Sequence, residues 1–448
     1  MLAPQTTENP IFWHITGASP AQIKAAADQS VEAGFEMMIL TFFTGFNILN
    51  TDPGYVSSMK EAFAYAHGKG IEVGGYWLVS SSADGGAANN VVNPLTGKVE
   101  SPEYGQSACL ASRYKEDVLD DKVKTFMATT GMDVIETDGP YHGDHCASTI
   151  HPHHKGLDDS RVSQHRILTD WYHEMVGKGI YINTPDSYMF NGAHKLPVGY
   201  SEESWSLPHW RQILAGRQFL FDGTFKRTPP MSWTFTPLEE YHGGGAEATV
   251  EPLSQNLKVY EWHLAQNFGS GVQSSWRGSR LFDGPETKAL VRKWVDFFKR
   301  YRTLLNADII HLKRPEPQPG NPDFTADLDY MMHVDPSGRR ALLMVYNQTA
   351  QTREKTLSIP LYYSGIRGQV RVREQEGAAE TRLCDSQGNV SVTVALASRS
   401  VTWFYLDQGT QTGIPGARLS GSRRGQVDRY DVDGRRARPG QGVHLPGK

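Results

Sequence analysis

The feature that most constrains the fold is an alternation of two kinds of segment over roughly the first 300 residues, as in barrels built from βα units. Short apolar runs such as residues 35–42 alternate with amphipathic segments of helical periodicity, the pattern of strands and helices in a parallel sheet. Ser19-Pro20 is a typical helix start, and Gly34 is a typical helix end. No Gly-rich GxGxxG turn follows any apolar run, which argues against a dinucleotide-binding sheet. The alternation therefore predicts an α/β fold, a (β/α)8 TIM barrel.

The expected elements can be placed by residue range. The apolar runs predict strands at 11–15, 35–42, 71–78, 132–137, 180–183, near 198–200 and at 271–275. One further strand is expected at either 219–221 or 231–235, and the pattern leaves that choice open. Helices are expected at 20–33, 56–68, 120–130, 160–176, 208–219, 253–268 and 285–301.

From residue 309 the sequence pattern changes to short segments of alternating apolar and polar residues, separated by Gly, Pro, Asn and Asp. This pattern predicts a small antiparallel β-sandwich after the barrel. Its strands are expected at 330–334, 341–346, 356–359, 369–373, 390–394 and 401–406. After residue 408 the chain is rich in Gly, Arg and Pro without apolar periodicity, which is typical of a disordered tail. The expected domains are the barrel at 1–306, the β-sandwich at 307–407 and the tail at 408–448.

Composition and charge exclude several classes of partner. With 39% hydrophobic residues, 21% charged residues and a formal net charge of -4, nothing favours nucleic acid or an anionic membrane as a partner. No apolar run is long enough to span a bilayer. The N-terminal segment lacks the basic and apolar regions of a secretory signal, so the chain as read is expected in the cytoplasm, or in a secreted or periplasmic location if its N-terminus is truncated. The oligomeric state stays open.

Acidic residues follow three of the expected barrel strands. In a (β/α)8 barrel the C-terminal ends of the strands form the active-site face. The fourth expected strand carries Glu136 and Asp138 on the same side, and Asp186, Glu202 and Glu203 follow the next two strands. Paired carboxylates are what glycosidases need, one to attack or steer water and one to protonate the departing oxygen. The alternatives are a turn-forming role for Asp186 and a helix N-terminal charge role for the two glutamates.

Aromatic and basic residues near the same strand ends complete the expected rim. Arg277 is expected to hydrogen-bond sugar hydroxyls or a substrate carboxylate, or to pair with one of the acidic residues. Trp13 and His14 either line the floor of the pocket or pack around it. The Gly-rich segment that contains His242 is a candidate lid. The expected substrate contacts are Trp13, His14, Trp77, Glu136, Tyr141, His142, Asp186, Lys195, Trp205, His242 and Arg277.

A histidine-rich segment follows the fourth expected strand. It contains His142, Asp144, His145, His151, His153 and His154. Imidazoles and a carboxylate suit zinc, but the spacing is irregular and no HExxH helix is present, so substrate contacts or loop scaffolding are favoured over a catalytic metal. The three cysteines form no CxxC pair, which indicates neither a disulfide framework nor a zinc ribbon. No metal and no cofactor is therefore expected, and a metal-dependent hydrolase or lyase stays an alternative.

At these residues the sequence resembles the retaining α-galactosidase clan, particularly glycoside hydrolase family 36 and its bacterial members. The resemblance rests on Asp138 at a strand end, the acidic pair Glu202 and Glu203 after a later strand, and Trp205 close behind. It implies that Asp138 is the nucleophile and that Glu202 or Glu203 is the acid/base. The sequence departs from the family at Glu136-Thr137-Asp138, where the family has Lys-Trp-Asp, and in having Glu rather than Asp as the acid/base.

The resemblance implies a retaining, exo-acting, α-galactosidase-like glycoside hydrolase with a carbohydrate substrate. A carbohydrate-binding barrel without catalytic activity is the alternative from another class, motivated by the altered family segments. The sugar and its anomeric configuration stay open.

Overall fold

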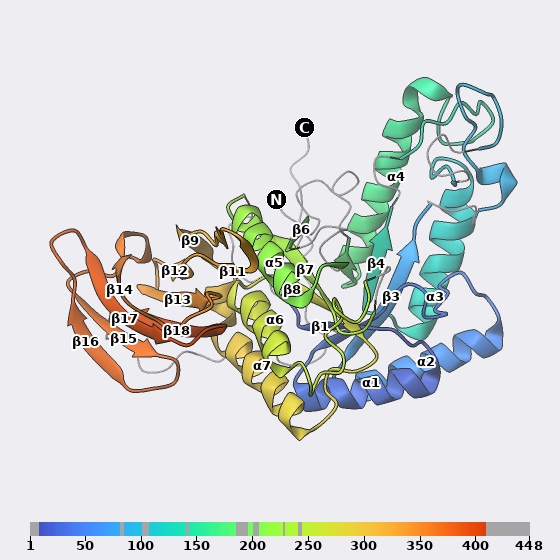
Figure 1. Ribbon diagram of the computed structural model, residues 1–448. Coiled ribbons are helices and arrows are strands. Elements are labelled where there is room, and N and C mark those ends of the chain that lie inside the picture. Colours follow the sequence, from blue (N-terminus) through green and yellow to red (C-terminus); the bar gives the residue numbers. More distant parts are fainter. Residues whose placement is uncertain are drawn as a thin grey trace, which may run out of the picture.

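The first part of the chain is an eight-stranded parallel sheet with helices on its outside (Figure 1). The computed structural model describes residues 9–80, 85–100, 107–139, 143–184, 196–199, 206–226, 229–240 and 244–408. The strand order is β5-β4-β3-β2-β1-β8-β7-β6, and neighbouring strands in this order run parallel. The strands are β1 (Phe12–Ile15), β2 (Met37–Leu40), β3 (Glu72–Leu78), β4 (Val134–Asp138), β5 (Tyr181–Asn183), β6 (Leu196–Gly199), β7 (Ser232–Pro237) and β8 (Gln273–Gly278). The predicted (β/α)8 barrel is confirmed.

Local sequence signals explain where the barrel helices begin and end. Ser19 caps α1, because its hydroxyl accepts a hydrogen bond from the Gln22 amide, while the Gln22 side chain accepts one from the Ser19 amide. Gly34 and Gly131 end their helices at φ of 82° and 78°, in the left-handed region that favours glycine. The helices are α1 (Pro20–Ala33), α2 (Pro53–Gly68), η2 (Ala87–Asn89), the π-helical η3 (Lys115–Val123), α3 (Lys124–Thr130), α4 (Leu157–Gly177), α5 (His209–Thr224), η5 (Pro229–Met231), α6 (Leu257–Gly269) and α7 (Pro285–Leu305).

One of the two alternatives for the seventh strand is wrong. Residues 219–221 lie inside α5, and the strand is β7 instead. A run of three apolar residues is too short for periodicity to distinguish a strand from a helix. Within that run Leu220 is buried whereas Phe219 is 38% exposed, as on one face of a helix.

Strand alternation divides the barrel interior into an apolar and a polar level. Phe12, Ile39, Val134 and Tyr181, which come from four strands, pack together in one buried cluster with Met37. Their sequence neighbours, such as Ile135, instead join the larger core that includes the helices. Two residues further along each of these strands, toward its C-terminal end, the inward-facing side chains are polar, as at Glu136 and Asn183. The polar level therefore faces the end where active sites of such barrels lie.

The C-terminal part forms the predicted antiparallel sandwich. A six-stranded sheet of order β16-β15-β18-β13-β12-β9 faces the two-stranded sheet β14-β17 across a buried apolar cluster that includes Leu343, Phe404 and Val392. The strands are β9 (Asp308–Lys313), β10 (Pro317–Gln318), β11 (Asn321–Thr325), β12 (Asp329–Asp335), β13 (Arg340–Asn347), β14 (Arg353–Pro360), β15 (Gln369–Glu374), β16 (Ala379–Leu383), β17 (Asn389–Leu396) and β18 (Ser400–Asp407), with a short η6 (Tyr362–Ser364). The sequence does not predict β9, β10, β11 or β16, because few of their side chains are fully buried and these segments show no apolar alternation.

The sandwich packs against the barrel on the side of α5, α6 and α7 (Figure 1). Side chains on the outer face of the six-stranded sheet, among them Met344 and Trp403, belong to the same buried core as the barrel helices. Arg217 of α5 forms a buried ion pair with Asp329 of β12, and its guanidinium lies 3.5 Å from the ring centroid of Tyr346. Burial lowers the pKa of Arg217 to about 10. This ion pair thus links the barrel to the sandwich within an otherwise largely apolar interface.

Within these described ranges, no helix combines the length and the apolar character that crossing a bilayer requires. The predicted tail lies outside the described residues from 409 onward.

Candidate active site

Asp138 is the last residue of β4, at the C-terminal edge of the parallel sheet. The next residue, Gly139, has φ of 70°, a left-handed conformation that turns the chain away from the strand. On the neighbouring strand β3, the Tyr76 hydroxyl donates a hydrogen bond of 2.6 Å to Asp138 Oδ2. A carboxylate is thus presented at the mouth of the barrel and oriented by a phenol from the adjacent strand.

Below Asp138, a hydrogen-bonded network of buried polar side chains crosses the barrel interior. Glu136 Oε2 accepts a hydrogen bond from Asn183 Nδ2 at 2.5 Å and lies 2.7 Å from His14 Nε2. A carboxylate only accepts hydrogen bonds, so an ionised Glu136 requires the hydrogen on His14 Nε2. The other ring nitrogen, Nδ1, is hydrogen-bonded to Ser275 Oγ. Because β1, β4, β5 and β8 each supply one member, the network fixes Glu136 and His14 as a rigid polar floor.

Arg277 lies in β8 rather than beyond it, which corrects the predicted end of that strand at residue 275. The side chain is buried, and its Nη1 donates a hydrogen bond of 2.7 Å to Thr41 Oγ1. Its guanidinium also lies 4.4 Å from the ring centroid of Phe42. A cation held between a hydroxyl and an aromatic face at this edge is suited to bind an anionic or hydroxyl-rich ligand.

Two of the predicted aromatic contacts point away from the barrel interior. Trp13 is buried in the core shared with the helices, and its Nε1 donates a hydrogen bond of 2.9 Å to the Gly278 carbonyl oxygen. Trp77 belongs to the same core and stacks on Tyr114 at an interplanar angle of 9°. Both indoles therefore pack the barrel wall, whereas the neighbouring Tyr76 is hydrogen-bonded to Asp138.

Several predicted site residues lie outside the described ranges, so their positions stay predictions. They are Tyr141, His142, Asp186, Lys195, Glu202, Glu203, Trp205 and His242. Both acid/base candidates belong to this set.

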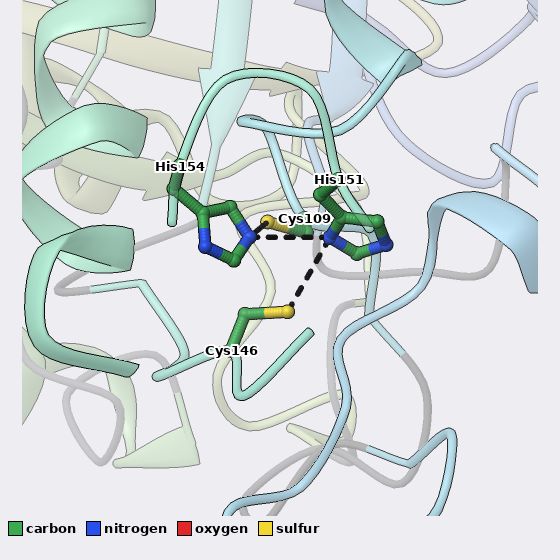
Figure 2. A group of neighbouring side chains, drawn as sticks. All are labelled: Cys109, Cys146, His151 and His154. Carbon is green, nitrogen blue, oxygen red and sulfur yellow. Dashed lines mark hydrogen bonds between the residues drawn. The ribbon is translucent and has the colours of Figure 1, made fainter. Parts of the chain in front are cut away.

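The histidine-rich segment contributes to several different contacts. His153 Nε2 lies 2.6 Å from Glu116 Oε1, and His145 Nε2 lies 3.1 Å from Arg161 Nη1. His151 and His154 instead join Cys109 and Cys146 in a buried group of side chains that could hold a metal ion (Figure 2). Sequence reasoning missed this group, because Cys109 precedes His154 by 45 residues and comes from a different loop.

Solved structures show what the fold is similar to. No protein-family model matches the chain, and no curated protein resembles it closely enough to count as a match. The α-galactosidase from Lactobacillus brevis is 13% identical, with a TM-score of 0.63 over 91% of this chain and 56% of that one. The family 36 α-galactosidase from Geobacillus stearothermophilus, solved with raffinose, is 13% identical, with a TM-score of 0.61 over 90% of this chain and 56% of that one.

An α-amylase from Geobacillus thermoleovorans, solved with acarbose, is 11% identical, with a TM-score of 0.58 over 92% of this chain and 100% of that one. The chain spans little more than half the length of the two α-galactosidases. Identities this low establish the fold alone. The protein therefore has a glycoside hydrolase fold related to that of the family 36 α-galactosidases, a TIM-like barrel followed by antiparallel sheets.

Proposed function

We propose that the protein is a retaining, exo-acting glycoside hydrolase of α-galactosidase-like specificity. The observation that carries the proposal is Asp138, which ends β4 at the mouth of the barrel and is hydrogen-bonded to Tyr76. A carboxylate at this position can reach the anomeric carbon of a sugar that enters from the C-terminal face. The buried Glu136 network beneath it supplies a rigid floor.

In the proposed mechanism, a carboxylate oxygen of Asp138 attacks the anomeric carbon while the bond to the leaving-group oxygen breaks. Glu202 or Glu203 protonates that oxygen, so an alcohol leaves and a glycosyl ester remains on Asp138. The same glutamate then removes a proton from water, which attacks the anomeric carbon and releases Asp138. Each of the two displacements inverts the configuration, so the product retains it.

The substrate class is inferred from the structural neighbours. Variants of one family 36 α-galactosidase with this fold, the enzyme from Geobacillus stearothermophilus, were solved with raffinose and with stachyose. Because exo-acting enzymes bind one terminal sugar against the barrel mouth, terminal α-galactosides are the first substrates to test. The altered family residues at Glu136-Thr137 support extending the panel to fucosides and uronides.

The test is hydrolysis of a panel of nitrophenyl glycosides by the wild type and by Asp138→Asn. Loss of the nucleophile should lower kcat/KM by on the order of a thousandfold or more. Asp121→Asn is the matched control, because Asp121 is an exposed aspartate on η3, and its rate should equal that of the wild type. Full activity of Asp138→Asn on every glycoside that the wild type cleaves would contradict the proposal.

Replacing Asp138 by glycine distinguishes a nucleophilic aspartate from one with a merely structural role. Asp138→Gly leaves room for azide, which can attack the anomeric carbon in place of the carboxylate. Azide should restore cleavage of an activated aryl glycoside and yield a glycosyl azide of inverted configuration. If the protein binds sugars with no turnover and no azide rescue, it is a carbohydrate-binding barrel instead.

A further inference from the structure

Four buried side chains converge beside the barrel, outside the proposed catalytic site (Figure 2). One ligand atom from each of Cys109, Cys146, His151 and His154 lies within 4.8 Å of all the others. The two cysteines are fully buried, and the two histidines are 7% and 6% exposed. We infer that these residues form a structural zinc site.

The spacing of the ligand atoms matches a tetrahedral zinc ion. Zn–S bonds of about 2.3 Å and Zn–N bonds of about 2.05 Å place S and N ligands about 3.6 Å apart and two N ligands about 3.3 Å apart in a tetrahedron. Cys109 Sγ lies 3.6 Å from His154 Nε2, and Cys146 Sγ lies 3.5 Å from His151 Nδ1. His151 Nδ1 and His154 Nε2 are 3.2 Å apart. One ion at the centre would therefore reach its ligands with little movement of the side chains.

Contacts around the cluster orient its ligands. His154 Nδ1 lies 3.1 Å from the carbonyl oxygen of Gly156, which can only accept, so Nδ1 carries the hydrogen. In the neutral ring Nε2 then presents its lone pair to the cluster. The backbone amide of Val92 donates to Cys146 Sγ at 3.4 Å, a contact that favours a thiolate. Such hydrogen bonds to the distal nitrogen of a histidine and to sulfur are typical of supported metal ligands.

Charge and coordination number favour zinc in a structural role. Two thiolates balance the charge of Zn²⁺, so the buried site would be neutral overall. A tetrahedral set of two sulfur and two nitrogen ligands suits zinc rather than magnesium or calcium, which prefer oxygen. Four protein ligands leave no position for a water or substrate, whereas catalytic zinc keeps one open. The site thus does not support the metal-dependent hydrolase considered from the sequence.

The ion would join two loops at the active-site end of the barrel. Cys109 lies in the connection from β3 to η3, whereas the other three ligands lie between β4 and α4, in the segment that leaves Asp138. Gln164 of α4 links the same two connections, since its Oε1 accepts from the Leu110 amide at 3.3 Å and its Nε2 donates to the Asp144 carbonyl at 2.9 Å. The metal would therefore fix the loop that follows the proposed nucleophile.

The metal content of the full-length protein tests the site. After expression with added zinc and removal of loosely bound ions, elemental analysis should find about one zinc per chain, as for a closed structural site. The variant with both Cys109→Ser and Cys146→Ser should lose this zinc. Cys384→Ser is the matched control, because the third cysteine lies in the sandwich, away from the cluster, and it should keep the metal.

Cobalt substitution keeps the test valid if the double variant does not fold. Wild-type protein stripped by a chelator and then titrated with Co²⁺ should show the visible bands of a tetrahedral ion and a sulfur-to-cobalt charge-transfer band, saturating near one equivalent. Chelation should also lower Tm, and zinc should restore it. No stoichiometric zinc in the wild type and no tetrahedral cobalt spectrum would overturn the inference. A Cys109–Cys146 disulfide in freshly purified protein, detected by mass spectrometry, would also overturn it.

Discussion

The hydrogen bond from Tyr76 to Asp138 gives a quantitative prediction about the site. Replacing Tyr76 by Phe removes a hydroxyl that lies 2.6 Å from Asp138 Oδ2 but keeps the ring, which contacts Phe42 at a centroid distance of 5.2 Å. A hydrogen bond to an ionised group contributes about 1.5–3 kcal/mol, and 1.36 kcal/mol is about tenfold in rate. Tyr76→Phe should therefore lower kcat/KM by about 10- to 150-fold, mainly through kcat, because the hydroxyl orients Asp138 for attack.

The assay is steady-state hydrolysis of the best nitrophenyl glycoside, with Tyr65→Phe as the matched control. Tyr65 also donates to an aspartate, Asp28, at 3.0 Å, but this pair links α1 and α2 on the outside of the barrel. The control should retain wild-type kinetics, and both variants should keep the wild-type Tm within a few degrees. If Tyr76→Phe hydrolyses the glycoside within twofold of the wild-type rate, then Tyr76 does not orient the reacting carboxylate.

Further predictions concern the stability of the fold and its dependence on pH. Asp329→Asn leaves Arg217 as an uncompensated buried charge and should cost about 3–5 kcal/mol in urea unfolding, whereas Arg217→Met with Asp329→Leu should recover most of it; equal losses in both variants would contradict this. Burial lowers the pKa of His263 to about 3 and that of His333 to about 4, from the ordinary 6.5. As the pH is lowered, the unfolded chain therefore binds these protons at a higher pH than the folded protein does. The free energy of unfolding is unaffected by the two histidines above about pH 6.5 and falls toward pH 4 by up to about 1.4 kcal/mol per pH unit for each histidine. His263→Leu should reduce that slope between pH 6 and pH 5, and an unchanged slope would contradict the assignment. Gly139→Ala forces a non-glycine residue to φ of 70° and should cost about 1 kcal/mol or more, seen as a lower urea midpoint.

Local signals in the sequence predict the barrel because they are properties of short segments. Ser19 and Gly34 mark the two ends of α1, and the apolar residues Val134 and Ile135 begin the short strand that ends at Asp138. The sequence does not show which side chains of a strand point into the barrel interior, since this depends on the register between neighbouring strands. Tyr76 and Trp77 are adjacent in sequence, and only the pairing of Tyr76 with Glu136 shows that Tyr76 is on the inner face.

Contacts between distant segments could not be predicted from a single sequence. Cys109 carries no metal-binding pattern by itself, because its partners lie in the loop after another strand. His14 is 122 residues from Glu136, and its hydrogen bond exists only because β1 and β4 face each other across the barrel interior. The polar floor and the zinc ligands are thus products of the fold, whereas Asp138 is visible in the sequence.

The most direct test of the central claim is to trap the covalent intermediate. An activated fluoroglycoside of the sugar that the wild type cleaves should form a glycosyl-enzyme that hydrolyses slowly, because fluorine destabilises the positively charged transition state. Intact-protein mass spectrometry should show the addition of one glycosyl group, and peptide mapping should place it on Asp138. A label on another residue, or an inverted product anomer with no trapped intermediate, would contradict the account.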